Sequence, residues 1–433
     1  MKYKSCKHLE KSLYLAPNEL RACCQRFFYK GKMRGDAKLL EISKENELTS
    51  ENLKDARKKL FDDIQLSKNE DCLGCPHLYE ADDEPKIDNK IDYLSVEHHS
   101  VCNLRCTYCS PIYYEGKKST YDVVKFIDDL KKNNSFENCE QVVWGGGEPT
   151  LEKSFEQIVK LIDYKINPKI YHRVFTNSVR FSPPLNNFLK EGLVKIVTSV
   201  DAGDPETFKK IRGRPRFKEV FENLSKYALH NPSLVTIKYI FTDENNNKDQ
   251  VDSFIDNCVK NNLENCNYQI SMNFKDEKLG VEKLKIILYL FGKLLSKNIK
   301  KIFVDDHIMF RFQTIKNTSL AEIKNFLKME RIEKTVIDKS KLNDVIIYGA
   351  GKIGNEIIKK TILNDNNLNF DIVDSSKEKI DKIIHGKKIN PPEFLINSHR
   401  KVFISAAQSY DEIYQNIIKL QGHEKNILSG MIL

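Results

Sequence analysis

The sequence predicts an α/β protein built around a partial (βα)6 barrel, and three observations support this fold class. From Tyr93 onward, short apolar runs alternate with amphipathic stretches, which is typical of a parallel sheet covered by helices. This alternation occurs six times, a number that suits an incomplete barrel. A further pattern of strand, glycine turn and helix opens near residue 344 and predicts a small Rossmann-like domain.

The barrel strands are expected where runs rich in Val, Ile, Tyr and Phe occur, at 93–98, 141–146, 171–177, 194–201, 236–242 and 267–274. Helical periodicity separates them, for example at 120–132, 154–165, 216–229 and 250–262. A chain of 433 residues is too long for one ordinary core, so several domains are expected. We predict a cysteine-rich region at 1–90, the barrel at 91–310, a helical linker at 311–340 and the Rossmann-like domain at 341–433.

Composition excludes several classes of protein. The net charge of +9 comes from lysines scattered along helices, which predicts solvated faces and no nucleic-acid partner. No apolar run reaches the roughly 20 residues that span a bilayer, and the N-terminus lacks the apolar core of a secretory signal. We therefore expect a cytoplasmic protein with no membrane partner. In that compartment, eleven cysteines in sparse clusters indicate metal ligation rather than disulfides.

Three cysteines directly follow the first barrel strand, in the stretch SVCNLRCTYCSP. Cys102, Cys106 and Cys109 have the spacing C-x3-C-x2-C at the strand end where a βα barrel carries its chemistry. Three thiolates can hold three irons of a cubane cluster and leave the fourth iron open, as catalytic metal sites do. The alternative is a zinc site completed by a distant histidine.

A second signal follows the next strand, in WGGGEPT. Gly146 and Gly147 would let the backbone approach a ligand closely, and Glu148 with Pro149 would form a polar edge suited to an ammonium group.

Together the cysteine loop, the aromatic Tyr108 before its third cysteine, and the GGEP motif resemble the radical S-adenosylmethionine (SAM) superfamily over roughly residues 92–275. The resemblance implies a [4Fe–4S] cluster whose open iron binds the amino and carboxylate groups of SAM. The reduced cluster would split SAM into methionine and a 5′-deoxyadenosyl radical, which removes a hydrogen atom from the substrate. A reductant such as flavodoxin or ferredoxin would be a partner.

The resemblance also implies roles for further residues. Asn177 ends the third strand, and Ser199 and Asp201 end the fourth, where family members hold the ribose of SAM. Arg212 lies where related enzymes place an arginine near the SAM carboxylate, a suitable partner for a guanidinium. The alternative for Arg212 is a solvated cation at a helix end.

The N-terminal region holds its own cysteines. It resembles the auxiliary-cluster segment of SPASM and twitch-type radical SAM enzymes, although there the segment follows the barrel. The implied ligands of a second [4Fe–4S] cluster are Cys6, Cys23, Cys72 and Cys75, with Cys24 as the alternative to Cys23 and a zinc site as the alternative cofactor. The remaining cysteines, Cys139, Cys258 and Cys266, are interpreted as inert packing residues.

The C-terminal unit begins with DVIIYGAGKIGNEI. Its glycines, Gly349, Gly351 and Gly354, lie between a strand and a helix start, and Asp374 ends the next strand. This pattern is typical of dinucleotide-binding folds, in which the helix N-terminus binds a phosphate and the acidic residue, here Asp374, accepts hydrogen bonds from a ribose. The alternative is a degenerate module for docking.

The substrate is less constrained than the chemistry. We expect a sugar or nucleotide sugar in glycan biosynthesis, because the C-terminal unit suits a nucleotide. A peptide substrate is the alternative, because auxiliary-cluster relatives often modify peptides.

Overall fold

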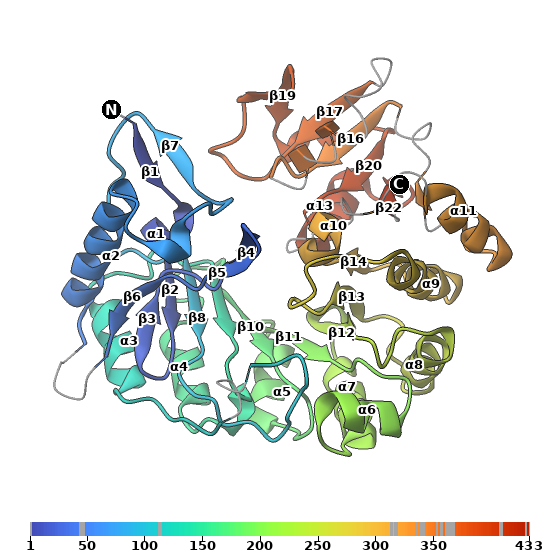
Figure 1. The fold of residues 1–433 in the computed structure, drawn as a ribbon, viewed down its shortest axis with the longest axis horizontal. Helices are drawn as coiled ribbons and strands as arrows, with labels where there is room; N and C mark the ends of the chain where they lie inside the picture. Colours follow the sequence, from blue (N-terminus) through green and yellow to red (C-terminus); the bar gives the residue numbers. More distant parts are fainter. Residues whose placement is uncertain are drawn as a thin grey trace. The chain divides into compact units, whose positions relative to one another are not determined.

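The computed structural model describes residues 2–42, 48–110, 115–311, 315, 319–333, 336–337, 343–351, 354–355, 358–359, 369–406, 410–428 and 431–432. The chain forms two compact units (Figure 1). The first comprises Met1–Ser199 and Arg212–Thr236, and the second comprises Val200–Ile211 and Ile237–Leu433. The expected four-part division of the chain stays a prediction.

The first unit is built on parallel strands that the sequence predicted. Strands β8 (Tyr93–Val96), β9 (Gln141–Trp144), β10 (Tyr171–Phe175) and β11 (Val194–Ser199) pair side by side in this order, and every pairing is parallel. Apolar side chains such as Leu94, Val142 and Val174 are fully buried. Parallel strands place all their carboxyl ends at one edge of the sheet.

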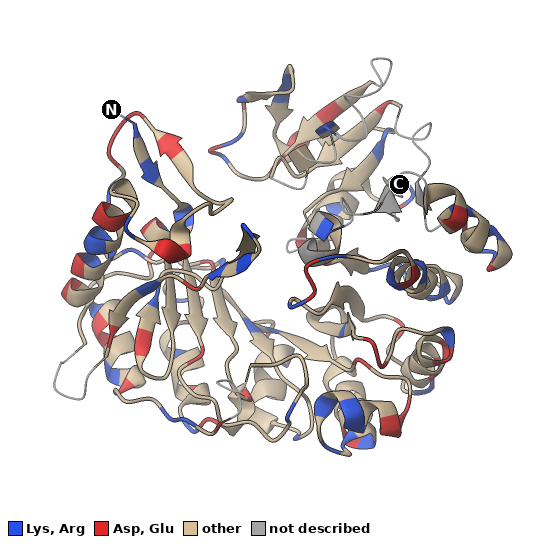
Figure 2. Ribbon diagram, viewed as in Figure 1, with Lys and Arg blue, Asp and Glu red and all other residues tan. Residues whose placement is uncertain are grey.

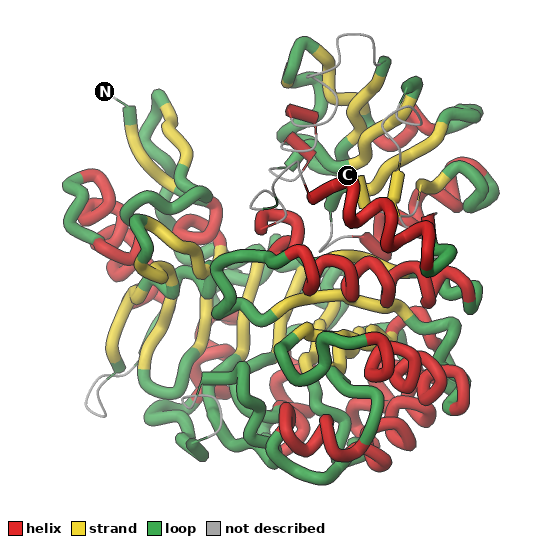
Figure 3. The backbone as a smooth tube through the Cα atoms, turned by 45° about the vertical axis from the view of Figure 1, so that its right-hand side comes forward, coloured by secondary structure: helices red, strands yellow, loops and turns green. Residues whose placement is uncertain are grey.

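Helices connect these strands, as expected. They are α3 (Val123–Lys132), α4 (Phe155–Leu161), α5 (Pro183–Lys190) and α7 (Phe217–Ala228), with the short turns η3 (Pro149–Leu151) and η4 (Pro232–Leu234). Asp122 caps α3 by accepting a hydrogen bond from the Lys125 N–H, and each helix buries one apolar face. Figure 3 shows this alternation of helices and strands.

The N-terminal region extends the same sheet beyond β8. Strand β2 (Ser12–Leu15) pairs parallel to β8, with Ser12 opposite Tyr93 and Leu15 opposite Val96. Strand β3 (Glu19–Arg21) runs antiparallel to β2, and β6 (Lys38–Glu41) runs antiparallel to β3. The cysteine-rich region is therefore joined to the barrel strands by backbone hydrogen bonds.

The rest of this region lies beyond the amino end of β2. It comprises β1 (Tyr3–Ser5), α1 (Lys7–Lys11), β4 (Arg26–Tyr29), β5 (Lys32–Gly35), α2 (Ser50–Gln65), η1 (Glu70–Cys72) and β7 (Tyr79–Ala81). Strands β4 and β5 form an antiparallel hairpin, and β1 pairs with β7. Helix α2 begins with a capping box on Thr49 and Asn52. Its outer face mixes both signs of charge, as expected of a solvated helix (Figure 2).

The second unit begins with α6 (Pro205–Arg212) and continues with further α/β elements. These are β12 (Val235–Phe241), α8 (Lys248–Lys260), β13 (Asn267–Met272), α9 (Val281–Ser296), β14 (Ile302–Val304), α10 (Asp306–Arg311) and α11 (Leu320–Met329). Strands β12 and β13 lie where the fifth and sixth barrel strands were predicted. Strand β14 follows β13 in parallel register.

The C-terminal sheet has the strand order of a doubly wound fold. Its order is β18-β19-β17-β16-β20-β21, and all neighbours are parallel except the pair β18–β19. Counting the parallel strands along the chain gives 3-2-1-4-5, which is the Rossmann order. The strands are β16 (Val345–Tyr348), β17 (Phe370–Val373), β18 (Ile383–Ile384), β19 (Lys387–Asn390), β20 (Lys401–Ile404) and β21 (Ile427–Leu428).

The remaining described elements of this part are η10 (Pro392–Leu395), α13 (Tyr410–Gln421), and the pair β15 (Val336–Ile337) and β22 (Met431–Ile432). Helix α13 packs its apolar face on β16 and β20 through Ile413 and Ile417. Within the described part of the chain, no helix has both the length and the hydropathy to cross a membrane.

Candidate functional site

The cavity that carries the predicted chemistry lies at the carboxyl edge of β8–β11. It is lined by Cys102, Leu104, Cys106, Tyr108, Cys109, Gly146, Gly147, Glu148, Phe175, Thr176, Asn177, Val197, Ser199 and Arg212. The cysteine loop therefore meets the GGEP loop, because the two loops follow neighbouring parallel strands. Cys102, Cys106 and Cys109 are called the barrel cysteines below.

The cysteine loop offers its sulfur atoms hydrogen bonds that suit thiolates. The Leu104 N–H donates to the Cys102 sulfur at 3.5 Å, and the Asn177 side-chain amide lies 3.7 Å from the same atom. Burial raises the pKa of the Cys102 thiol, while the Arg212 charge lowers it. Three half-buried thiols around one cavity, with N–H donors to sulfur, fit a cluster that is held by thiolates.

The two glycines of the GGEP motif line the cavity and are also packed against the cysteine loop. A Cβ atom on Gly147 would lie 2.3 Å from the Val101 carbonyl oxygen, and one on Gly146 would lie 2.8 Å from that of His99. The Gly147 N–H donates to the His99 carbonyl at 2.9 Å, and the Glu148 N–H donates to the Val101 carbonyl at 2.8 Å. The close approach is therefore to the backbone of the cysteine loop, and it locks the two loops together.

Glu148 is buried and organises the strand ends around it. One carboxylate oxygen accepts from the Thr176 and Thr150 hydroxyls at 2.8 and 2.7 Å, and the other accepts from the Asn177 N–H at 2.6 Å. Burial raises its pKa, although these hydrogen bonds oppose the shift. Because Glu148 also lines the cavity, its second oxygen is suited to an ammonium group of a ligand. Pro149 is not part of the lining and starts the turn η3.

Arg212 and Tyr108 close the other side of the cavity. The Arg212 guanidinium donates to the Tyr108 hydroxyl and lies 5.7 Å from the centre of its ring. The Arg212 carbonyl accepts from the Arg105 N–H at 3.0 Å, so the backbone of the cysteine loop is also fixed to this segment. A guanidinium held at the cavity wall is well placed for a carboxylate.

Of the two predicted ribose residues, only Ser199 lines the cavity. Asp201 lies in the second unit and is fully buried, with a positive φ of 61°. Its carboxylate accepts from the Ile240 N–H at 2.7 Å, and burial raises its pKa to about 8. Sequence reasoning missed the lining residues Phe175 and Val197, which the strand periodicity could have placed on one face with Ser199.

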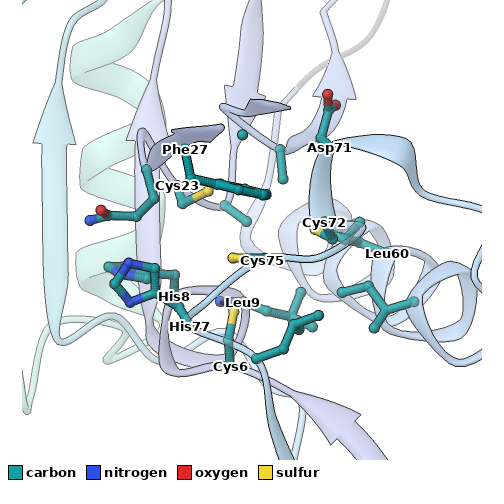
Figure 4. Close-up of a pocket in the computed structure, with 16 residues that line it drawn as sticks. Cys6, His8, Leu9, Cys23, Phe27, Leu60, Asp71, Cys72, Cys75 and His77 are labelled. Carbon is teal, nitrogen blue, oxygen red and sulfur yellow. Dashed lines mark hydrogen bonds between the residues drawn. The ribbon is translucent and has the colours of Figure 1, made fainter. Parts of the chain in front are cut away.

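The four N-terminal cysteines predicted as ligands line one pocket. In Figure 4 the sulfur atoms of Cys6, Cys23, Cys72 and Cys75 are turned toward a common space. We call them the auxiliary cysteines. Burial raises the pKa of the Cys6, Cys23 and Cys72 thiols, that of Cys6 to about 12. The charges of neighbouring thiolates raise these pKa values further. Unloaded, the pocket therefore favours protonated thiols, and a metal centre must displace those protons.

Cys24 is directed away from this pocket. Its thiol contacts the Tyr14 hydroxyl, and burial raises its pKa to about 12. The geometry thus favours Cys23 over Cys24 as the ligand. Among the described lining residues of the auxiliary pocket there is no Lys or Arg, whereas His8 and His77 stand beside the cysteines. Within the described residues, no three His, Cys, Asp or Glu side chains converge tightly enough to hold a single metal ion.

The C-terminal glycine turn and Asp374 are brought together as predicted. The Asp374 carboxylate accepts from the Ala350 N–H at 2.7 Å and from the Lys379 ammonium at 3.0 Å. Gly349 has φ of 119°, and Gly354 is closely packed because an added Cβ would lie 2.0 Å from the Gly349 carbonyl oxygen. Gly351 faces open space. The predicted phosphate-binding helix start includes residues 352–353, which lie outside the described residues.

Comparison with known proteins defines the class of the barrel. Residues 96–255 match the model of the radical SAM superfamily. This part of the chain is a radical SAM domain. The predicted α/β partial-barrel fold class is thereby confirmed, as are SAM and a [4Fe–4S] cluster as cofactors.

Curated relatives match about a third of the chain. The chain is 33% identical over 136 residues to GTP 3′,8-cyclase of Haemophilus influenzae, covering 31% of this chain and 40% of the relative. It is 31% identical over 149 residues to GTP 3′,8-cyclase of Vibrio cholerae, covering 33% and 43%. The chain thus spans about two fifths of the length of these relatives.

Solved structures give weaker likenesses. Streptococcus suis SuiB bound to the precursor peptide SuiA matches with a TM-score of 0.42 and 14% identity, covering 61% of this chain and 66% of that one. The structure of anSMEcpe with bound AdoMet matches with a TM-score of 0.39 and 21% identity, covering 48% and 63%.

Proposed function

We propose that the protein binds SAM at the cavity of the barrel cysteines and cleaves it reductively to start a radical reaction on a nucleotide or nucleotide-linked sugar. The observation that supports SAM cleavage is the convergence of three thiols, Glu148 and Arg212 on one cavity. A zwitterionic amino-acid group needs one anion and one cation, and these two side chains supply them.

The chain's own residues have distinct parts in this reaction. The barrel cysteines hold the cluster, Arg212 binds the carboxylate of SAM, and Glu148 accepts from its ammonium group. A [4Fe–4S] cluster held by these cysteines would supply the one electron that cleaves a carbon–sulfur bond of the SAM sulfonium, giving methionine and a 5′-deoxyadenosyl radical. That radical takes a hydrogen atom from a substrate C–H bond.

Anaerobic reconstitution with iron and sulfide tests this function. With dithionite, the wild type should convert SAM to 5′-deoxyadenosine and methionine in equal amounts. Alanine at any one barrel cysteine should remove the activity and most of the iron bound there, because thiolates are the protein ligands of this cluster. Cys139→Ala is the matched control, since that thiol is fully buried elsewhere and should be dispensable. Cleavage that survives in a barrel-cysteine variant would contradict the assignment.

A nucleotide substrate is supported by the C-terminal sheet. Ligands of doubly wound sheets bind at the carboxyl ends of the strands where the strand order reverses. There the glycine turn after β16 lies beside Ser405 after β20, whose hydroxyl donates to the Gly349 carbonyl at 2.8 Å. The relatives named GTP 3′,8-cyclase are consistent with a nucleotide, although they match only about a third of the chain.

Calorimetry of the full chain against a panel of nucleotides and nucleotide sugars tests this assignment. Gly351→Val should weaken binding at least tenfold, because the new side chain enters open space at the turn without a clash inside the protein. Gly280→Val is the control, because Gly280 is an exposed glycine with a negative φ and no atoms near an added Cβ. If no nucleotide binds, the C-terminal unit is a docking module and a peptide substrate becomes the better proposal.

We also propose that the auxiliary cysteines hold a second [4Fe–4S] cluster. The four thiols share one pocket without a basic side chain among its described lining, and a cluster carrying iron would offset their mutual repulsion. Four protein ligands leave no open iron for a substrate.

A further inference from the structure

The two cysteine sites lie at opposite ends of the strands of one sheet. The barrel cysteines follow the carboxyl end of β8. Strand β2 runs parallel to β8, and Cys6 precedes it across the short helix α1. Because β3 returns antiparallel with Arg21 opposite Tyr14, Cys23 lies beside the amino end of β2. The four residues of β2 therefore separate the two edges by roughly 13 Å, at about 3.3 Å per residue.

The auxiliary pocket lies close to the protein surface. All four auxiliary cysteines are half-buried, and the loop between Cys72 and Cys75 is exposed, with Leu73 at 40%. A centre at this place is accessible to a partner protein, whereas a cluster with four protein ligands cannot bind a substrate through iron. These two properties suit one-electron transfer.

The β4–β5 hairpin covers this loop. The Tyr29 ring lies directly over Gly74, where an added Cβ would come within 2.2 Å of it. The Arg34 guanidinium donates to the Glu70 carbonyl at 2.7 Å and lies 3.2 Å from the Glu70 carboxylate. The position of the hairpin relative to the cysteine loop is thereby fixed.

The tip of this hairpin is basic and partly apolar. Lys30 and Lys32 flank Gly31 in its turn and are exposed, and Met33 beside them is 51% exposed. Strand β7 and the segment after it are acidic, with Glu80 in the strand and Asp82, Asp83 and Glu84 after it. An acidic partner is therefore attracted to the hairpin and repelled from the β7 segment.

We propose that the hairpin tip, with Leu73 of the cysteine loop, is the docking surface of an acidic one-electron donor protein, and that the electron enters at the auxiliary cysteines. This inference rests on the proposed function for its cofactors. The donor loses one electron and the auxiliary centre gains it, with no bond made or broken, before the electron passes along the sheet to the barrel site. Reduced flavodoxin has the required chemistry and is the probe.

Binding is measured by calorimetry at low ionic strength with the reconstituted full chain and flavodoxin. Lys30→Glu/Lys32→Glu should raise the dissociation constant at least tenfold, about 1.4 kcal/mol, and wild-type binding should weaken as salt is added. Lys218→Glu/Lys226→Glu on α7 is the matched control, because it makes the same charge change at exposed lysines of another element. The control should bind flavodoxin like the wild type.

A second readout separates docking from chemistry. The ratio of the flavodoxin-driven to the dithionite-driven rate of SAM cleavage should fall at least tenfold in the hairpin variant, because dithionite needs no docking surface. Absence of wild-type binding, or equal losses in the hairpin and control variants, would overturn the inference. If dithionite itself fails with the wild type, it is the proposed function that is wrong.

Discussion

Replacing Gly147 by alanine is the most direct test of how the cavity is assembled. The new Cβ would lie 2.3 Å from the Val101 carbonyl oxygen and 2.8 Å from the Val101 nitrogen, both backbone atoms that cannot rotate away. Ordinary contact distance would require the two loops to separate by about 1 Å. The hydrogen bonds from Gly147 N–H to His99 and from Glu148 N–H to Val101, at 2.9 and 2.8 Å, would then exceed bonding distance.

The energetic cost follows from these two bonds. Each contributes about 1 kcal/mol, and a buried polar group left unpaired costs about 1–3 kcal/mol more. With two bonds lost and one buried group left unpaired, we therefore expect Gly147→Ala to lower the free energy of unfolding by about 3–5 kcal/mol, measured by urea denaturation, and to reduce the iron bound at the barrel cysteines. Gly145→Ala is the control, because its Cβ meets only the flexible Glu97 side chain at 3.3 Å. Wild-type stability and iron content in Gly147→Ala would refute the reasoning.

Three further predictions concern metal, pH and SAM. The triple alanine variant of the barrel cysteines should keep about half of the wild-type iron, and zinc without iron in that variant would contradict the auxiliary cluster. His172 accepts from the Trp144 indole at 3.0 Å and contacts the Ile162 carbonyl at 2.7 Å, and burial lowers its pKa to about 4. Because the neutral form is native, its stabilisation is lost as pH falls from 6.5 toward 4, by about 3 kcal/mol. His172→Gln keeps a donor and an acceptor but cannot protonate, so its unfolding free energy should fall less steeply with acid. Arg212→Lys should weaken SAM binding in equilibrium dialysis about tenfold, because the bidentate fork is lost; unchanged affinity would remove Arg212 from the site.

The part of the site that could be predicted from sequence is the part fixed by local order along the chain. The cysteine loop, the GGEP loop and Asn177 each follow a parallel strand directly, so the sheet alone brings them to one edge. No long-range information is needed for that step. The same logic placed Gly349 and Asp374 together, since each ends a neighbouring strand of the C-terminal sheet.

For a residue that lies further from the end of its strand, the sequence does not predict where its side chain points. Asp201 comes two residues after β11, has a left-handed φ of 61°, and is not among the residues that line the cavity. Its carboxylate accepts a hydrogen bond from the backbone of β12. This is a tertiary contact that no local sequence pattern predicts. Similarly, the sequence predicts that the glycines of the GGEP motif are sites of close approach. It does not predict that the backbone of the cysteine loop is what they approach.

The attachment of the N-terminal region could not be predicted for a related reason. Strand β2 has only four residues, all buried, so it shows no alternation. Its partner β8 lies about 80 residues further along the chain, and only the folded structure defines that register. A buried arginine also attaches the N-terminal region to the barrel strands. Arg57 of α2 donates hydrogen bonds to the carbonyls of Ser12, Asp88 and Lys90 at 2.8–2.9 Å.

The hydrogen bonds of Arg57 also connect the two cysteine sites through packed secondary structure. Arg57 ties the helix beneath the auxiliary pocket to the start of β2 and to the segment that leads into β8. Burial of a guanidinium is costly unless its N–H groups find acceptors, so these three elements are held in one arrangement. Strand β8 in turn leads directly into the barrel cysteines. The N-terminal cysteine region is therefore part of the same packed sheet as the SAM cavity, and the separation between the two sites is set by the length of the strands rather than by a linker.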